Sequence, residues 1–474
     1  MTSVHPNRSL AATVRQYPVF LCPTLSVTMK PRLRSPAFGP GAATNLMERF
    51  VVEGGHRLRG TIRPAGNKNA ALPIVAACLL TEQPVTLRNL PGIEDVRTLL
   101  AIVEQLGATV ERLGSNEVRV TASGPLSSAP DEVLSRKIRA SILLAGPLLA
   151  RKQSATLGKP GGDAIGRRRI DTHILALEAL GAKAEVSRSL VRLTTGGLRG
   201  AAMFLDEASV TATENAVMAA VLAKGRTSIY NAAAEPHVQD LCHFLNGLGA
   251  RISGIATNLI VIEGVEGLRG GEFTIPSDHI EVGSYIGLAA VTGGEIVIED
   301  AVPQHLMAVR PMLEKLGVAI EVDGTTVLVR ADQELTVRYE LGSAVPKIDD
   351  GPWPLFPADL LSIMTVIATQ AEGTCMIFEK MFESRLFFTD RLIEMGARII
   401  LCDPHRAIVV GRSRLYGAEI TSPDIRAGMA LLLAALCAEG QSVIHNIQQI
   451  DRGYERIEER LSSLGAQIVR EADR

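Results

Sequence analysis

Four short segments of the sequence place charged side chains next to glycines or predicted helix starts. The first, residues 66–69, reads Gly-Asn-Lys-Asn and precedes an apolar segment that begins at Ala70. Backbone N–H groups are unpaired at a helix N-terminus, so Lys68 there could help to bind an anion. The simpler alternative is that Asn67 or Asn69 caps the helix and that Lys68 is solvated.

The second segment, residues 161–173, combines glycines with three consecutive arginines, Arg167, Arg168 and Arg169. The glycines favour a mobile loop, and the guanidinium groups could bind phosphate or carboxylate in bidentate fashion. A solvated basic loop is the ordinary alternative. A metal site made by Asp163, Asp171 and His173 is not favoured, because the arginines would repel the ion and the spacing fits no common ligand pattern.

The third and fourth segments lie in the second half of the chain. Asp359 ends the sequence Phe-Pro-Ala-Asp at a predicted helix start, where it would be an N-cap or, if it faces a cleft, a general base. Arg385, Arg426 and Arg452 each follow a predicted strand. Each arginine alone would form a surface ion pair, but neighbouring repeats could bring the three together.

These side chains belong to a repeat that recurs six times. In each copy an amphipathic helix ends in Leu-Gly-Ala or a close variant, and a strand pair such as 109–120 or 397–410 follows. Glycine is the residue expected at a left-handed helix C-cap. The repeated glycines are Gly107, Gly181, Gly249, Gly317, Gly396 and Gly465.

Each repeat also carries a second helix that is apolar on nearly every side and is therefore predicted to be buried. Amphipathic helices such as 95–106 and 456–464 are predicted at the surface. Six units favour an α/β fold with two lobes of three units each, and a groove between similar lobes is a natural ligand site. The predicted buried helices are 70–80, 138–150, 213–223, 284–291, 360–370 and 426–438.

Composition excludes several classes of protein. The 474 residues carry a net charge of -2, with 46% hydrophobic and 4% aromatic residues, which favours a globular chain and argues against a nucleic-acid-binding protein. The longest apolar run, 427–438, is shorter than the ~18 residues of a membrane-spanning helix. The six cysteines are scattered, as is typical of buried, reduced thiols in a cytosolic protein. The basic residues 1–46 are interpreted as a disordered leader or a start assigned too early, with a transit peptide as the alternative.

Taken in order, the motifs resemble the enolpyruvyl transferase family, in its UDP-N-acetylglucosamine branch, from about Met47 to the C-terminus. The resemblance implies a two-lobed inverse α/β barrel fold of six repeated βα units, three per lobe. Residues 47–67 plus 279–474 would form the catalytic lobe, and residues 68–278 a second lobe with a mobile catalytic loop at 160–171. The motifs are Gly-Asn-Lys-Asn-Ala-Ala-Leu-Pro from Gly66, Arg-Ala-Ser-Ile from Arg139, Pro-Gly-Gly from Pro160, Ser-Val-x-Ala-Thr from Ser209, Phe-Pro-x-Asp ending at Asp359 and Ile-Asp-Arg-Gly-Tyr-Glu-Arg-Ile-Glu from Ile450.

The resemblance also implies an activity. The family transfers the enolpyruvyl group of phosphoenolpyruvate to the 3-hydroxyl of UDP-N-acetylglucosamine and releases phosphate, through a tetrahedral ketal and without metal or cofactor. This is the first committed step of peptidoglycan precursor synthesis, so we expect a cytoplasmic enzyme with small-molecule substrates and with no nucleic-acid or membrane partner. Two alternatives stay open: another acceptor such as shikimate 3-phosphate, or a catalytically silent paralogue that only binds a sugar nucleotide.

The site residues that the resemblance implies fall into three overlapping groups. The catalytic residues would be Asp163, Asp359 as the base, and Lys68. Phosphoenolpyruvate would bind to Lys68, Asn69, Arg168, Arg385, Arg426 and Arg452. UDP-N-acetylglucosamine would bind to Asn69, Arg139, Arg168, Asp171, Ser209, Val210, Thr211, Asp359 and Met381.

The sequence departs from the family pattern at four places. Asp163 stands where most members have a cysteine, which is the general acid for C3 of phosphoenolpyruvate and the target of the antibiotic fosfomycin. Arg169 replaces a common proline, Thr211 replaces a glycine, and the 345–354 loop is longer than usual. A carboxylic acid can also donate a proton, and a carboxylate is a poor nucleophile toward an epoxide. We therefore expect Asp163 to act as the general acid in the closed, substrate-loaded state and the enzyme to be insensitive to fosfomycin.

Overall fold

The computed structural model describes residues 48–163 and 165–472, which lie in one compact unit, and these residues form two separate hydrophobic cores. One core draws on residues 50–62 and 280–468, and we call this part the terminal lobe. The other core draws on residues 70–275, and we call this part the inserted lobe. The interpretation of residues 1–46 as a leader falls outside the described residues.

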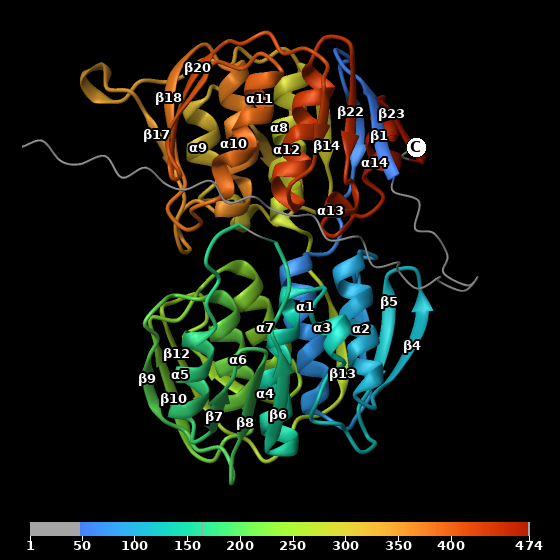
Figure 1. Ribbon diagram of the computed structural model, residues 1–474, viewed down its shortest axis with the longest axis vertical. Helices are drawn as coiled ribbons and strands as arrows, with labels where there is room; N and C mark the ends of the chain where they lie inside the picture. The colour runs from blue at the N-terminus through green and yellow to red at the C-terminus, as the bar shows by residue number, and fades with distance from the viewer. Residues whose placement is uncertain (1–47, 164, 473–474) are drawn as a thin grey trace, which may run out of the picture. The chain divides into compact units, whose positions relative to one another are not determined.

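Three buried helices form the centre of the terminal lobe: α8 (His279–Thr292), α10 (Leu361–Gln370) and α12 (Ile425–Cys437). They contact one another, and three four-stranded sheets surround them (Figure 1). In spatial order, the first sheet contains β21 (Glu419–Thr421), β22 (Gln441–His445), β1 (Glu48–Glu53) and β23 (Gln467–Ala472). The second contains β15 (Glu321–Asp323), β16 (Thr326–Val329), β14 (Glu295–Ile298) and β2 (Arg59–Ile62). The third contains β17 (Lys347–Asp349), β18 (Gly373–Phe378), β20 (Arg406–Gly411) and β19 (Ile399–Asp403).

The inserted lobe repeats this plan around α1 (Lys68–Ala77), α4 (Ala145–Lys152) and α6 (Val210–Ala220). Two of its sheets have four strands and one has three (Figure 1). In spatial order, the first sheet contains β13 (Gly271–Thr274), β3 (Val85–Arg88), β5 (Glu117–Thr121) and β4 (Thr109–Gly114). The second contains β11 (Arg251–Ser253), β12 (Leu259–Glu263), β10 (Arg226–Tyr230) and β9 (Ala202–Phe204). The three-stranded sheet contains β6 (Ser154–Gly158), β8 (Leu190–Thr194) and β7 (Lys183–Val186).

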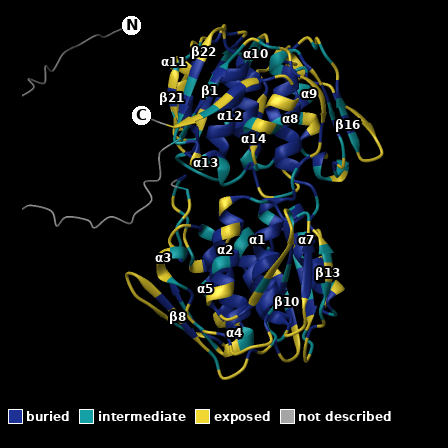
Figure 2. Ribbon diagram, turned by 90° about the vertical axis from the view of Figure 1, so that its right-hand side faces the viewer, coloured by how far each residue is buried: buried dark blue, intermediate teal, exposed yellow. Residues whose placement is uncertain are grey.

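Burial distinguishes the central helices from the outer ones. In Figure 2 the central helices α1, α8 and α12 are mostly dark blue, whereas the outer helix α5 shows exposed residues.

The remaining α-helices are α2 (Glu94–Gln105), α3 (Glu132–Ser135), α5 (Asp171–Ala179), α7 (Pro236–Gly247), α9 (Arg310–Lys315), α11 (Thr389–Glu394), α13 (Gln448–Asp451) and α14 (Ile457–Ser463). The 3₁₀ segments are η1 (Cys78–Leu80), η2 (Arg139–Leu144), η3 (Pro303–Leu306), η4 (Leu341–Ser343), η5 (Ala358–Leu360) and η6 (Arg385–Phe388).

The structure confirms the six-fold repeat. All six predicted apolar helices are helical and buried, although the one predicted at 138–150 is 3₁₀ in its first half, η2. The six repeat glycines all have φ between 80° and 110°, the left-handed region that glycine adopts without a steric cost. The strand pairs predicted at 109–120 and 397–410 are β4–β5 and β19–β20.

Two neighbouring chain segments connect the lobes. Gly66 and Ser277 form an isolated β-bridge, the Asn67 N–H donates to the Pro276 carbonyl at 2.8 Å, and the Asp278 N–H donates to the Ala65 carbonyl at 2.9 Å. The segment that enters the inserted lobe is therefore hydrogen-bonded to the segment that leaves it.

Two details of the sequence interpretation were wrong. Cys402 lies exposed on β19, because a strand at the edge of a sheet places alternate side chains in solvent. Arg452 does not follow a strand directly, because the short helix α13 separates it from β22. Among residues 48–163 and 165–472, no helix combines the length and the apolar character that crossing a bilayer requires.

Candidate active site

One cavity is lined by residues of both lobes, and most of the candidate residues meet there. The inserted lobe contributes helix starts and the 160–171 loop, and the terminal lobe contributes the ends of its sheets and central helices. The candidates that line the cavity are Lys68, Asn69, Arg139, Asp163, Arg168, Val210, Thr211, Asp359, Met381, Arg385, Arg426 and Arg452. Asp171 and Ser209 are not among its lining residues.

Asp359 lies between two buried arginines. Its Oδ1 accepts from Arg385 Nη1 at 3.0 Å, and its Oδ2 accepts from Arg426 Nε at 3.0 Å. Burial alone would raise the pKa of Asp359, but the charges of Arg426 and Arg385 outweigh it and hold the pKa well below its usual value. Asp359 is therefore ionised at neutral pH.

The interpretation of Asp359 as an N-cap was wrong. The N-cap of η5 is Pro357, and no side chain caps this helix start. Asp359 is the second residue of this helix, and its carboxylate accepts from the two arginines. Arg385 and Arg426 are each only 5% exposed, which excludes the alternative of surface ion pairs for both.

Tyr454 and Phe382 hold the two arginines in place. Arg426 Nη1 donates to the Tyr454 hydroxyl at 3.3 Å, and that hydroxyl lies 3.1 Å from the Ser284 hydroxyl on α8. The Arg385 guanidinium lies 5.0 Å from the centre of the Phe382 ring, a cation–π distance. These contacts hold both guanidinium groups in position.

A second charge network joins the lobes through Asp95, at the start of α2. Asp95 Oδ2 lies 2.9 Å from Lys68 Nζ, and Asp95 Oδ1 accepts from Arg452 Nε at 2.9 Å. Arg452 also forms an ion pair with Asp163 of the 160–171 loop. Burial raises the pKa of Asp95, but Lys68 and Arg452 lower it by more.

Lys68 is held by the start of α1. Asn67 caps this helix: its Oδ1 accepts from the N–H groups of Asn69 at 2.8 Å and Ala70 at 3.2 Å. The capping alternative was therefore correct for Asn67, but Lys68 is buried and ion-paired, not solvated.

The 160–171 loop contacts the terminal lobe at several points. Besides the Asp163–Arg452 ion pair, the Arg167 N–H donates to Glu383 at 3.0 Å, and the Ser384 N–H donates to the Ile165 carbonyl at 3.2 Å. These contacts hold the loop against the cavity.

Of the three consecutive arginines, only Arg168 lines the cavity. Burial lowers its pKa, Asp163 opposes that effect, and the nearby charge of Arg385 lowers the pKa further. Arg139 also lines the cavity, and burial and Arg168 lower its pKa to about 10. Cations crowded in this way are stabilised by a bound polyanion.

Arg167 and Arg169 are exposed, as the solvated-loop alternative expects. Arg169 pairs with Asp171 at 2.5 Å, and Asp171 begins helix α5. Ser209 precedes α6 as its N-cap residue, but its side chain makes no capping hydrogen bond.

Both ring nitrogens of His173 are hydrogen-bonded, one to Asn215 and the other to Thr211. Asn215 Nδ2 donates to His173 Nδ1 at 2.9 Å, so the ring proton sits on Nε2 and is donated to the Thr211 hydroxyl at 3.0 Å. Burial, assisted by Arg139, lowers the pKa of His173 to about 3, so the ring is neutral. Within the described part of the chain, no group of three His, Cys, Asp or Glu side chains could hold a metal ion.

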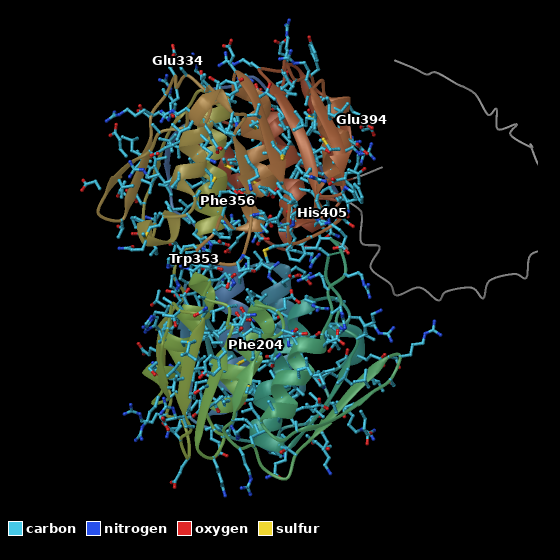
Figure 3. The ribbon with its side chains drawn as sticks, turned by 90° about the vertical axis from the view of Figure 1, so that its left-hand side faces the viewer. Phe204, Glu334, Trp353, Phe356, Glu394 and His405 are labelled. Carbon is cyan, nitrogen blue, oxygen red and sulfur yellow. The ribbon has the colours of Figure 1, made fainter. Side chains whose placement is uncertain are left out.

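The 345–354 segment includes β17 and reaches the inserted lobe. Trp353 lines the cavity, and its N–H donates to Glu235 Oε1 at 3.2 Å. Figure 3 shows Trp353 close to Phe356, which is buried at the start of the Phe-Pro-Ala-Asp motif. Burial raises the pKa of Glu235.

Sequence reasoning missed Asp95 and Glu383. A signal existed for Asp95, because it lies four residues before Leu99 and seven before Ile102, on the apolar face of its helix. No comparable local pattern marks Glu383, whose role depends on a loop more than 200 residues earlier in the chain.

The comparisons with known proteins agree with this geometry. The family model of EPSP synthase (3-phosphoshikimate 1-carboxyvinyltransferase) matches residues 52–461. A UDP-N-acetylglucosamine 1-carboxyvinyltransferase of Bradyrhizobium diazoefficiens is 57% identical over 90% of this chain and 98% of its own length. One of Treponema denticola is 54% identical over 89% of this chain and 99% of its own length.

Solved structures show the same fold. The enolpyruvyl transferase NikO from Streptomyces tendae superposes with a TM-score of 0.81 at 24% identity, over 90% of this chain and 100% of that chain. EPSP synthase from Acinetobacter baumannii gives a TM-score of 0.71 at 19% identity over the same shares. The expected two-lobed fold is confirmed, and the chain belongs to the enolpyruvyl transferase family that includes EPSP synthase and UDP-N-acetylglucosamine 1-carboxyvinyltransferase.

Proposed function

We propose that the protein transfers the enolpyruvyl group of phosphoenolpyruvate to the 3-hydroxyl of UDP-N-acetylglucosamine and releases phosphate. The observation that carries this proposal is the convergence of Lys68, Arg168, Arg385, Arg426 and Arg452 on one cavity that also contains two carboxylates, Asp163 and Asp359. The high identity to enzymes of that name over nearly their whole length supports the choice of acceptor.

The cations suit a small, highly charged substrate. Phosphoenolpyruvate carries a phosphate and a carboxylate, and guanidinium groups bind both with charge-assisted hydrogen bonds. Because the arginines are buried and fixed by their neighbours, they need little reorganisation when the anion binds. Lys68 and Arg452 would approach it from opposite lobes.

Asp359 is the proposed base. It is ionised, and its oxygens accept hydrogen bonds from Arg385 and Arg426. A substrate anion that takes over part of those contacts would weaken their hold on Asp359 and add a like charge nearby, and both effects raise its basicity. The carboxylate can then accept the proton of the sugar 3-hydroxyl as that oxygen attacks C2 of phosphoenolpyruvate.

Asp163 is the proposed acid. In the closed, substrate-loaded state Asp163 would be protonated, and in the addition step it would give that proton to C3, which becomes a methyl group in the tetrahedral ketal. In the elimination step the Asp163 carboxylate would take a proton back from that methyl group as the C2–O bond to phosphate breaks, so that the enolpyruvyl double bond forms again. The leaving phosphate would take the proton held by Asp359. The loop contacts of Arg167 and Ile165 would keep water out while Asp163 acts.

The remaining assignments extend the same proposal. Asn69, Arg139, Val210, Thr211 and Met381 line the cavity and would contact the sugar nucleotide. Asp171 and Ser209 lie outside this lining and would reach the nucleotide only at its far end. The terminal lobe would be the catalytic lobe. An enzyme with this activity would act in peptidoglycan precursor synthesis, and we place it in the cytoplasm as part of the same proposal.

Phosphate release tests the proposal. The purified chain would be incubated with phosphoenolpyruvate and, in parallel, UDP-N-acetylglucosamine, shikimate 3-phosphate or no acceptor. We expect release only with UDP-N-acetylglucosamine, and a product heavier by one enolpyruvyl group in the mass spectrum. Release with shikimate 3-phosphate would show a different acceptor. Binding of the sugar nucleotide without any release would show a silent paralogue.

A further inference from the structure

Two buried carboxyl groups, Asp350 and Glu379, lie side by side behind Arg385. They directly follow β17 and β18, which pair in parallel with Asp349 opposite Phe378. The next residues in this register are Asp350 and Glu379, so their side chains start from neighbouring positions. Both residues have no solvent exposure.

Each carboxyl group has one oxygen with partners and one without. Glu379 Oε1 accepts from the N–H groups of Met381 at 3.2 Å and Phe382 at 3.1 Å, and Asp350 Oδ1 accepts from the Lys380 N–H at 2.5 Å. Glu379 Oε2 and Asp350 Oδ2 are buried without a hydrogen-bond partner among the described residues. Two ionised groups in this arrangement would repel each other and would each leave an oxygen unsatisfied.

We propose that Asp350 and Glu379 share a single proton, and that this pair positions residues 379–385 at the active site. One proton between Oδ2 and Oε2 supplies the missing partner to both oxygens and removes one of the two negative charges. Neither residue belongs to the catalytic or substrate-binding groups assigned above. The positioning role rests on the proposed function, but the shared proton does not.

The segment that the pair would position contributes to the site in three ways. Met381 and Phe382 line the cavity, and the backbone N–H groups of both donate hydrogen bonds to Glu379. Phe382 stacks near the guanidinium of Arg385. Glu383 accepts a hydrogen bond from the backbone N–H of Arg167 in the 160–171 loop. The geometry of this one turn therefore affects the cavity wall, an anion-binding arginine and the closed loop together.

Among the described residues, one cation, Arg385, lies within ion-pair distance of the pair. Lys347 and Lys380 both form ion pairs with Asp349. His405 Nδ1 lies 2.7 Å from the backbone carbonyl oxygen of Glu379. The nearest cation is Arg385, whose Nε lies 3.9 Å from Glu379 Oε2.

Titration would break the pair at alkaline pH. Burial and the contact with Asp350 raise the pKa of Glu379 to about 9, although Arg385 opposes them. The proton is thus present at neutral pH and is lost as the pH rises through that value. The second carboxylate would then attract Arg385 through its Nε and draw it away from Asp359 and the substrate.

Amide and alanine variants distinguish a pair that keeps a donor between the two side chains from one that has lost it. Glu379→Gln keeps the acceptor for Met381 and Phe382 and supplies an N–H donor to Asp350. Asp350→Asn does the same in reverse. At neutral pH we expect both to keep kcat and the KM for phosphoenolpyruvate within about threefold, whereas Glu379→Ala and Asp350→Ala raise that KM about tenfold. Glu379→Gln as impaired as Glu379→Ala would overturn the positioning role.

The pH profile gives a readout that loss of stability would not move. For the wild type, kcat/KM for phosphoenolpyruvate should fall as the pH rises through the pKa of the pair, and this fall should disappear in Glu379→Gln. Glu372→Gln, which removes an exposed charge just before β18, serves as the matched control and should keep the wild-type profile. An unchanged alkaline fall in Glu379→Gln would contradict the proposal.

Infrared spectroscopy tests the proton without any use of activity. The difference spectrum of the wild type minus Glu379→Gln at neutral pH should contain the C=O stretching band of a protonated carboxyl group, and so should the difference with Asp350→Asn. A missing band overturns the shared proton. A chain that shows the band but releases no phosphate would overturn the proposed function and leave the shared proton in place.

Discussion

Asp163 and Asp359 line the same cavity but have different partners. Asp359 is held by two buried arginines of its own lobe, while Asp163 pairs from the 160–171 loop with Arg452 of the other lobe. An anion that binds to Arg385 and Arg426 acts on Asp359 at once. Asp163, by contrast, takes its place only when the loop lies against the terminal lobe. The two carboxylates are therefore suited to different steps of one reaction.

The role of Asp163 can be tested with fosfomycin. A carboxylate is a far poorer nucleophile toward an epoxide than a thiolate, so the wild type should form no adduct detectable by mass spectrometry. Asp163→Cys should keep measurable turnover and gain one fosfomycin adduct per chain. Asp163→Ala should lose about two decades of turnover, the scale of general acid catalysis. A stoichiometric adduct on the wild type, or full turnover in Asp163→Ala, would contradict the assignment.

Asp359→Asn separates proton transfer from anion binding. The amide cannot take the proton of the acceptor hydroxyl, so phosphate release should fall by about two decades. Removing the negative charge between Arg385 and Arg426 should leave phosphoenolpyruvate binding, measured by calorimetry, as tight or tighter. Asp390→Asn, an exposed change on α11, is the control. Loss of phosphoenolpyruvate binding in a folded Asp359→Asn protein would count against the base assignment.

Acid should remove the contribution of Asp359 to stability. Its pKa is lower in the folded state than the ~3.9 of an unfolded aspartate, so its ion pairs stabilise the fold above that value and are lost as the pH falls below it. The free energy of unfolding of the wild type should exceed that of Asp359→Asn at neutral pH, and the difference should shrink on acidification. Urea unfolding across acid and neutral pH measures it. A difference that grows toward acid would have the wrong sign.

At the scale of elements, the repeat explains which parts of the fold the sequence predicts. The central helices and the glycine ends were predictable because both depend on local pattern: an apolar sequence on all sides, and a left-handed residue at a helix end. For Asp359, the local sequence left an N-cap as the simplest alternative to a base, because only its neighbours in sequence were visible. One of its partners, Arg426, begins the apolar helix of the next repeat, and Asp95 likewise has a partner, Arg452, in another repeat. Such contacts depend on how repeats pack, which no single segment encodes.

Two of the repeat glycines provide a matched pair of substitutions. Gly107 and Gly465 have φ of 110° and 96°, but a Cβ on Gly107 would meet the Pro125 carbonyl at 2.7 Å, whereas one on Gly465 would meet nothing within 4 Å. Gly465→Ala should reduce the free energy of unfolding by ~1–2 kcal/mol, the cost of the left-handed backbone alone. Gly107→Ala should lose ~1–3 kcal/mol more. Equal losses in denaturant unfolding would contradict this steric argument.

At the scale of the whole described unit, several of the contacts between the lobes are polar and involve residues at or next to the cavity. Arg452 binds Asp95 and Asp163, Glu383 binds Arg167, and Glu235 binds Trp353. Polar contacts of this kind are replaced by water at modest cost, so lobes joined by them can separate and return. Substrates could enter and products leave in this way.

Limited proteolysis can follow the loop contact of Glu383. Glu383→Ala removes the acceptor of the Arg167 N–H, so trypsin should cut within Arg167–Arg169 about threefold faster or more, because local opening governs the cleavage rate. Phosphoenolpyruvate together with UDP-N-acetylglucosamine should slow the cut in both proteins. Glu394→Ala, at an exposed position of the terminal lobe (Figure 3), should be cut like the wild type. Identical rates for all three would show that Glu383 does not hold the loop.

The bridge between Gly66 and Ser277 has a consequence for the gene. Because the inserted lobe starts and ends at hydrogen-bonded neighbours, deleting the codons in between would leave two chain ends that a turn of a few residues could join. The excised stretch would likewise have its two ends together and its own hydrophobic core. Each piece could then be expressed as a separate polypeptide. Alternatively, the ends of the excised piece could be joined and the chain opened elsewhere, which gives that piece a new pair of termini. The coding sequence thus reads as one module interrupted by another.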